Sequence, residues 1–169
     1  MMQSNEEEVI IVNKDDQIIG YKRRGSLNKD DIYRVSALWI TNSEREILLA
    51  KRHHTKLRHP NLWGPAVAGT NEKGETYKSN IIKEAEEEIG IKNFEPILGP
   101  KIEISDEYHY FTQWFTLCIN KNDFNFRIQE TEVEEIGWFK SEELADRLHI
   151  HPEEFLPRMK KYYQLFSKI

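Results

Sequence analysis

A short acidic helix constrains this chain more than any other part of its sequence. In the segment "KEAEEEIG", glutamate occupies positions 84, 86, 87 and 88. The stretch Thr76–Ile89 has the pattern of a helix, with Thr76 as a candidate N-cap and Gly90 as a candidate C-terminal stop. At about 100° per residue, its apolar side chains fall in one sector: Ile81, Ile82, Ala85 and Ile89.

Three of these glutamates would lie side by side on the predicted helix. Glu84, Glu87 and Glu88 are spaced i, i+3 and i+4 and share a sector roughly 100° wide, whereas Glu86 points elsewhere. Like charges at these spacings destabilise a helix. An acidic run is often just a solvated helix face. However, a divalent cation would relieve the repulsion, and Mg²⁺ takes carboxylate oxygens, waters and phosphate oxygens as ligands.

The size and charge of the chain restrict the classes of protein to which it can belong. Its 169 residues suit one domain, which we expect over residues 9–169 after a flexible N-terminus at residues 1–8. A net charge of −5 argues against binding to nucleic acid or to a membrane surface. The sequence has no apolar run of the roughly 20 residues that a membrane span needs. The acidic start lacks the features of a secretory signal, and the single cysteine, Cys118, excludes an internal disulfide, so we expect a reduced, cytoplasmic protein.

The rest of the sequence alternates strand-like runs with helical runs. Segments rich in β-formers predict strands at residues 9–12, 18–20, 33–41, 46–52, 110–119 and 134–139. Residues 53–75 contain several prolines and glycines and are predicted to be irregular. Helical periodicity returns at residues 140–148 and 151–166, where Pro152 suits a first turn and Pro157 a kink or break. This order predicts a mixed α/β or α+β domain.

The acidic helix is part of a longer pattern, "GTNEKGETYKSNIIKEAEEEIGI", which runs from Gly69 to Ile91. This stretch resembles the Nudix box, G-x5-E-x7-R-E-U-x-E-E-x-G-U, in which U is an apolar residue. Six glycine and glutamate positions of the box match, which ordinary residue frequencies make very improbable by chance: Gly69, Glu75, Glu84, Glu87, Glu88 and Gly90. Lys83 stands where the family has arginine, so the charge is kept but the planar fork that can hold two carboxylate oxygens is lost.

The resemblance implies a fold, a cofactor and roles for the residues of the box. The fold is the Nudix α/β/α sandwich, a mixed β-sheet between helices. Glu84, Glu87 and Glu88 would be the catalytic and metal-binding side chains and would bind Mg²⁺ or Mn²⁺ together with the backbone carbonyl of Gly69. One of the three, or a more distant glutamate, would activate the water. The remaining residues of the box would be structural: Glu75, Lys83 and Gly90.

A basic segment, "KRHHTKLRHP", precedes the box at residues 51–60. From about Val9 to Phe139 the chain resembles the branch of the family related to isopentenyl-diphosphate isomerase. In that branch an arginine and a lysine four residues later contact the diphosphate, and Arg52 and Lys56 match them. Guanidinium and ammonium groups suit phosphate oxygens. A solvated loop with incidental charges is the alternative, and no basic face elsewhere supports RNA binding.

The resemblance predicts a Mg²⁺-dependent pyrophosphohydrolase that cleaves a nucleoside diphosphate linked to another moiety. Its partner would be this small-molecule diphosphate, and family members often form homodimers. Aromatic residues at Trp63 and 108–111 suit core packing and could also stack on a base. Two other functions stay open, namely isomerisation of isopentenyl diphosphate and diphosphate binding without catalysis. The isomerase needs a cysteine in the loop before the box, where this chain has "WGPAVAGTNE", and a non-catalytic protein has no need to keep mutually repelling carboxylates.

Overall fold

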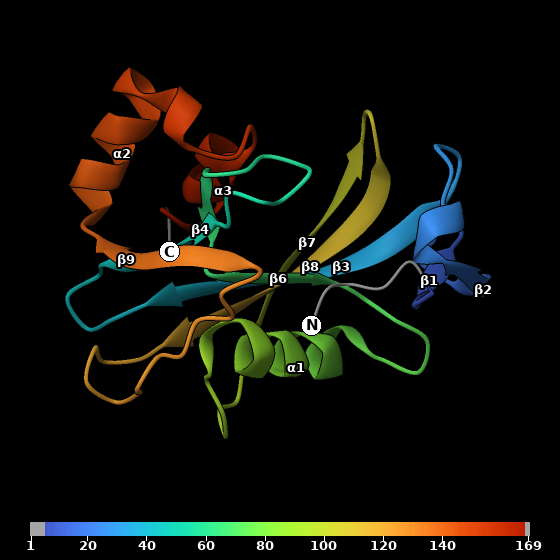
Figure 1. Cartoon of the computed structure of the whole chain (residues 1–169), viewed down its shortest axis with the longest axis horizontal. Helices are drawn as coiled ribbons and strands as arrows, with labels where there is room; N and C mark the ends of the chain where they lie inside the picture. Colours follow the sequence, from blue (N-terminus) through green and yellow to red (C-terminus); the bar gives the residue numbers. More distant parts are fainter. Residues whose placement is uncertain (1–5, 168–169) are drawn as a thin grey trace.

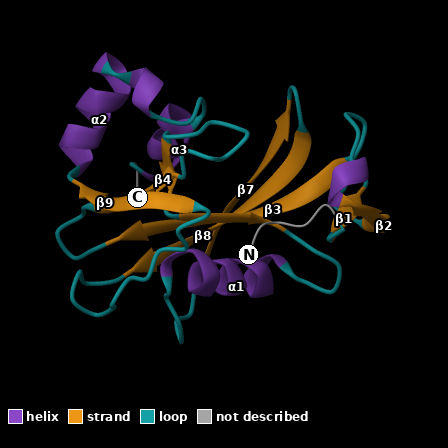
Figure 2. Ribbon diagram, in the orientation of Figure 1, coloured by secondary structure: helices purple, strands orange, loops and turns teal. Residues whose placement is uncertain are grey.

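A twisted mixed β-sheet with helices on both faces forms the framework of the protein (Figure 1; Figure 2). The structure is a computed structural model that describes residues 6–167. Helix α1 (Tyr77–Ile89) covers one face of the sheet, and α2 (Ser141–Ile150) and α3 (Met159–Phe166) lie on the other face. The predicted α/β/α sandwich is therefore confirmed. No helix in this part of the chain is long and apolar enough to cross a membrane.

The sheet is built around β3, which pairs with four other strands. Within residues 6–167 the strands are β1 (Glu8–Val12), β2 (Ile18–Arg23), β3 (Ile32–Thr41), β4 (Ile47–Arg52), β5 (Trp63–Pro65), β6 (Val67–Thr70), β7 (Ile97–Ser105), β8 (His109–Cys118) and β9 (Val133–Phe139). Strand β3 is antiparallel to β1, β4 and β6 and parallel to β8. Strand β2 extends the sheet beyond β1, β7 lies beside β8, and β5 and β9 both pair with β4. Strand β6 is antiparallel to β3, and β9 is antiparallel to β4. With this arrangement, the segment before β9 lies on the same side of the sheet as α1 (Figure 1).

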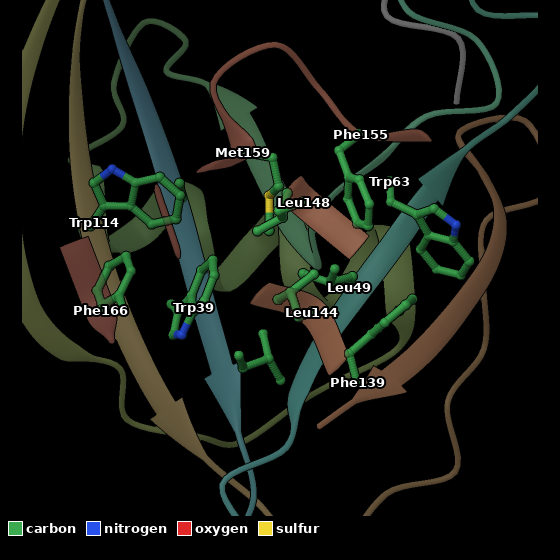
Figure 3. Close-up of a cluster of buried hydrophobic side chains, with 12 residues drawn as sticks. Trp39, Leu49, Trp63, Trp114, Phe139, Leu144, Leu148, Phe155, Met159 and Phe166 are labelled. Atoms are coloured by element: carbon green, nitrogen blue, oxygen red, sulfur yellow. The ribbon is translucent and has the colours of Figure 1, made fainter. Parts of the chain in front are cut away.

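Side chains along β3 alternate between two hydrophobic clusters. Leu38 and Ile40 belong to the cluster that includes the apolar face of α1, whereas Trp39 between them belongs to the cluster beneath α2 and α3. The two-residue period of a strand produces this separation, because successive side chains point to opposite faces. Figure 3 shows the second cluster, in which Trp39 and Phe166 stack with their ring centroids 4.8 Å apart. Both faces of the sheet are therefore covered by helices.

Helix α1 begins and ends where the sequence predicts. The Thr76 side chain accepts a hydrogen bond from the backbone N–H of Ser79 at 3.1 Å, and the Ser79 hydroxyl accepts one from the backbone N–H of Thr76 at 2.9 Å. These reciprocal bonds form a capping box. Gly90 ends the helix with a φ of 76°, which favours glycine, and a Cβ there would lie 3.1 Å from Arg127. Both ends of the acidic helix are therefore fixed.

Several segments differ from the pattern that the sequence predicts. Strands β5 and β6 lie in the stretch predicted to be irregular, where pairing with β4 and β3 outweighs the glycines and prolines. Strand β7 is not predicted at all, and β2 continues beyond Gly20 to Arg23. The last predicted helix, residues 151–166, is instead a 3₁₀ turn, η2 (Pro152–Glu154), followed by α3. Pro157 lies in the break between them, because proline cannot donate the helical hydrogen bond.

The proposed boundaries of the flexible N-terminus can be compared with the structure only in part. Residues 1–5 lie outside the described residues. Strand β1 starts at Glu8, one residue before the expected start of the domain. Glu7 makes an ion pair with Arg24 at 3.1 Å, and its backbone carbonyl accepts the N–H of Arg24 at 2.8 Å. A single domain over residues 9–169 stays a prediction.

Candidate active site

A cavity of about 220 Å³ lies where α1 faces the segment that precedes β9. Its lining is largely acidic: Glu7, Glu72, Lys83, Glu84, Glu87, Glu88, Gln129 and Glu132. The helical spacing therefore brings Glu84, Glu87 and Glu88 to one cavity. Glu86 is exposed, as its position on the helix predicts, and pairs with Lys92 at 2.6 Å.

The Glu84 side chain packs against β6, where a glycine leaves room for it. The Glu84 side chain is 9% exposed, and one of its oxygens lies 3.4 Å from Asn80 Nδ2 and 3.6 Å from Lys83 Nζ. A Cβ at position 69 would overlap the Cγ and Cδ atoms of Glu84. The Glu84 side chain therefore occupies the space that a side chain at position 69 would need.

Burial raises the pKa of two carboxyl groups in the cavity. Desolvation raises the pKa of Glu84 to about 7, and Glu87 and Glu75 raise it too, whereas Lys83 opposes them. The pKa of Glu88 is raised well above its ordinary value, first by burial and then by the charges of Glu84 and Glu132. A cation bound nearby would lower the pKa of these buried carboxyl groups, because it favours their charged form.

Lys83 connects the box carboxylates through a single ammonium group. Its Nζ lies 2.7 Å from Glu75, 3.4 Å from Glu72 and 3.6 Å from Glu84. Although burial lowers the pKa of Lys83, these carboxylates outweigh burial and raise the pKa above its ordinary value. Lysine thus stays charged at the position where the Nudix box has arginine.

Glu75 supports the start of α1. Its Oε2 accepts the backbone N–H of Glu72 at 2.8 Å and the Nδ2 of Asn80 at 2.8 Å, while its Oε1 faces Lys83. All three contacts are within the box and its flanking loop. This geometry supports the structural role that the resemblance implies for Glu75.

Arg52 and Lys56 are coupled to the cavity through Glu132. Lys56 forms an ion pair with Glu132. Burial lowers the pKa of Arg52, while the charges of Glu132 and Glu88 raise it, so the guanidinium lies in the field of both carboxylates. The Nε of Arg52 also donates to the backbone carbonyl of Arg58 at 3.1 Å. Neither cation lines the cavity itself, and both lie beside it on the end of β4 and the loop that follows.

Some residues of the cavity are not predicted from the sequence. Glu132 is remote from the box in sequence, and Glu7 belongs to the acidic N-terminus that the sequence predicts to be flexible. Glu72 lies at an unrestricted position of the box. The resemblance allows for a more distant glutamate, and the acidic segment "ETEVEE" at residues 130–135, which runs into β9, is the one available signal for Glu132.

The box carboxylates are gathered but are not tightly clustered. Among residues 6–167, His53, His54 and Glu134 are the group of three whose candidate ligand atoms all lie within 4.8 Å of one another. The ligand atoms of Glu84, Glu87 and Glu88 do not form such a group among these residues. Their hard oxygen donors nevertheless fit Mg²⁺, which is bound through few carboxylates and keeps several waters.

A second, larger hollow of about 910 Å³ is formed by the β3–β4 turn, α2 and α3. It shares no lining residue with the acidic cavity. Its acidic residues come from the β3–β4 turn and from α2, and none of them belongs to the box. The acidic cavity is therefore the candidate active site.

Replacing Glu84 by glutamine is expected to stabilise the metal-free protein more at pH 8 than at pH 5. Because the pKa of Glu84 is raised from 4.5 to about 7 in the folded state, the unfolded chain loses its proton first. Folding stability therefore falls as the pH rises from about 4.5 towards 7, by on the order of 3 kcal/mol at most. An amide does not titrate, so Glu84→Gln avoids this loss.

Thermal unfolding in EDTA at pH 5 and pH 8 measures the effect. Glu86→Gln is the matched control, since Glu86 is exposed on the same helix and outside the cavity. An equal change in Tm at the two pH values for Glu84→Gln would contradict the raised pKa.

The sequence matches the profile of the NUDIX domain over residues 32–159. It is 30% identical over 115 residues to isopentenyl-diphosphate Delta-isomerase 1 of Photorhabdus laumondii, a match that covers 66% of this chain and 65% of that protein. The chain therefore spans just under two thirds of the length of this relative. It is 28% identical over 152 residues to prenyl-diphosphate phosphatase of Methanosarcina mazei, which covers 89% of both chains.

The fold is similar to that of solved structures. The crystal structure of DR0079 from Deinococcus radiodurans matches with a TM-score of 0.77 at 20% identity and covers 95% of this chain and 99% of that one. At this identity the likeness shows the fold alone.

Proposed function

This chain belongs to the NUDIX domain family, and on that basis we propose that it is a divalent-cation-dependent hydrolase of a small-molecule diphosphate. The observation that carries the proposal is the acidic cavity, which Glu84, Glu87 and Glu88 line together with Lys83. These repelling carboxylates have no use in a protein that binds diphosphate without a cation. The bond cleaved is a phosphoanhydride.

The box supplies the groups that would hold the cation. Glu84, Glu87 and Glu88 are the carboxylate ligands for Mg²⁺ or Mn²⁺, and the carbonyl of Gly69 is the backbone ligand. When bound, such an ion polarises a phosphoryl oxygen and lowers the pKa of a water molecule. Lys83 keeps Glu84 in place from one side, and the bare Cα of Gly69 leaves room for it on the other.

Arg52 and Lys56 would bind the phosphate oxygens. Arginine offers a fork of N–H donors and lysine a compact charge, so together they suit two phosphates. Lys56 is paired with Glu132 in the structure. A phosphate that takes Lys56 from this pair leaves the Glu132 carboxylate at the cavity free to accept a proton from the attacking water. Glu132 is thus our candidate for the distant glutamate.

Aromatic rings near the phosphate-binding loop favour a nucleoside as the attached group. Arg58 follows Lys56 on this loop, and its guanidinium lies 4.1 Å from the centroid of the Tyr108 ring. Tyr33 and Tyr110 stack with their centroids 5.3 Å apart. Aromatic and guanidinium faces stack on nucleobases, at about 1–3 kcal/mol per base. We therefore propose a nucleoside diphosphate linked to another moiety as the substrate class.

A prenyl diphosphate is the second candidate substrate. It is favoured by the similarity to a prenyl-diphosphate phosphatase, which extends over 89% of both chains. Arg52 and Lys56 would recognise the diphosphate of either substrate without reading the attached group. A cytoplasmic location and a homodimer stay predictions from the sequence.

A substrate panel tests the proposal. The purified chain is incubated with Mg²⁺ or Mn²⁺ and either nucleoside diphosphate derivatives or prenyl diphosphates, and the products are identified by mass spectrometry. We expect cation-dependent cleavage of a phosphoanhydride bond, fastest with a nucleoside derivative. Faster turnover of a prenyl diphosphate would replace the first candidate by the second. No turnover of any diphosphate with either cation would contradict hydrolysis.

A further inference from the structure

Two histidines and a glutamate meet where the end of β4 faces β9, outside the acidic cavity. His53 and His54 directly follow β4, and Glu134 is the second residue of β9. The Glu134 Oε2 lies 2.8 Å from His54 Nδ1 and 3.5 Å from His53 Nε2. One ligand atom from each of the three side chains lies within 4.8 Å of the other two.

A β-bulge directs Glu134 towards the histidines. Lys51 pairs with Glu135 and Arg52 pairs with Val133, so Glu134 is the extra residue on β9 at this point. A bulge breaks the regular alternation of side chains and re-aims one of them, and bulges are frequent next to functional sites. The meeting of the three side chains therefore depends on a specific backbone feature as well as on rotamers.

The two imidazole rings lie close together and contact neighbouring groups. Their centroids are 4.1 Å apart, with an angle of 36° between the ring planes. The His53 side chain is 18% exposed, and its Nδ1 lies 2.7 Å from the Thr55 hydroxyl. With Nε2 on a metal, the Nδ1 proton is donated to this oxygen, and the weaker contact from the Thr55 amide at 3.2 Å is given up. A bond of this kind fixes the orientation of a metal-binding histidine.

Glu134 presents a negative charge to both rings. The ring Nδ1 and the backbone N–H of His54 lie 2.8 and 3.2 Å from the same oxygen of Glu134, Oε2. An ionised carboxylate has no proton to donate, so the His54 ring nitrogen facing it carries one. A metal ion takes the place of such protons when histidine becomes a ligand. The charge and the geometry of the group thus both suit a cation.

We propose that His53, His54 and Glu134 form a binding site for a transition-metal ion of the class of Zn²⁺, separate from the box. Two imidazoles and one carboxylate match the ligand preference of Zn²⁺, whereas Mg²⁺ prefers oxygen ligands alone. Ligand atoms about 2.0 Å from a tetrahedral metal stand about 3.3 Å apart. The distances of 2.8 and 3.5 Å from Glu134 lie on either side of this separation.

Such an ion would join the phosphate-binding loop to the sheet. His53 and His54 open the loop that carries Lys56, and Glu134 belongs to β9. The backbone N–H of His53 also donates to the carbonyl of Glu132 at 3.0 Å, which places the site directly beside the Lys56–Glu132 pair. Three protein ligands leave a fourth position for water or an anion. The ion would therefore restrict the loop and add positive charge next to it.

Calorimetric titration of the full chain with Zn²⁺ in saturating Mg²⁺ tests the site. We expect about one tightly bound equivalent in the wild-type protein, and at least about tenfold weaker binding in His54→Ala and in Glu134→Gln. His109→Ala is the matched control, because His109 pairs with Glu103 at 2.7 Å and belongs to no group of three candidate ligands among residues 6–167. Glu84→Gln is the second control and reports any Zn²⁺ held by the box.

The site is refuted if the wild-type protein shows no saturable Zn²⁺ binding, or if His54→Ala and Glu134→Gln bind as tightly as wild type. Loss of binding in Glu84→Gln alone would place the ion in the acidic cavity and refute it as well. Circular dichroism establishes that each variant is folded, and Zn²⁺-induced shifts of the His53 and His54 ring resonances provide a second readout. Since binding is measured without substrate, this result and the test of hydrolysis can fail independently.

Discussion

Glu84→Gln and Glu88→Gln are each expected to lower kcat/KM on the best substrate by at least about a hundredfold. Both carboxylates line the acidic cavity, and both are held in place by contacts of the box: Glu84 against Gly69 and Glu88 by the backbone N–H of Ala68. Glutamine keeps the shape of glutamate but loses the charge that a divalent cation requires. Steady-state kinetics over a range of Mg²⁺ concentrations measures the loss.

Glu86→Gln serves as the control for these two variants. The substitution removes the same charge from the same helix. However, Glu86 is exposed and pairs with Lys92 outside the cavity. Its activity should stay close to that of the wild-type protein. Near-normal turnover by Glu84→Gln or Glu88→Gln would show that the assignment of the metal ligands is wrong, whatever the control does.

Isopentenyl diphosphate incubated with the protein and Mg²⁺ is expected to give no dimethylallyl diphosphate. The segment before the box has no thiol. In the structure it forms β5 and β6, and both Val67 of β6 and Ala66 between the two strands are buried. Cys118 is exposed at the end of β8 and does not line the acidic cavity. Allylic proton transfer therefore lacks the thiol that the isomerase uses. Binding of the substrate is still expected, through Arg52 and Lys56.

Deuterium incorporation from heavy water is the sensitive measurement for this reaction. Mass spectrometry of the recovered isoprenoid should show none, while cleavage of a diphosphate proceeds in a parallel sample. Incorporation above a no-protein control would assign the chain to the isomerase reaction despite the sequence of this segment. Cys118→Ala would then establish whether the exposed thiol takes part.

The sequence by itself determined the local features of the site. The spacing of Glu84, Glu87 and Glu88 is a property of any α-helix, and the capping pattern at Thr76 and the glycine at 90 set the limits of α1. These features depend on residues close together in the chain, so periodicity and capping preferences are sufficient to predict them. The α/β/α sandwich could also be predicted from the sequence, because a nearly complete Nudix box restricts the fold strongly.

The tertiary structure alone decided which distant residues join this helix. Glu132 reaches the cavity because β9 pairs with β4, and Lys56 meets Glu132 for the same reason. The segment Val67–Thr70 forms a strand, despite its glycine, because β3 supplies the hydrogen bonds. This pairing places Gly69 against Glu84. The bulge that turns Glu134 towards His53 and His54 likewise depends on strand register. Contacts of this kind arise from pairing between remote segments, and neither residue spacing nor local preference specifies that pairing.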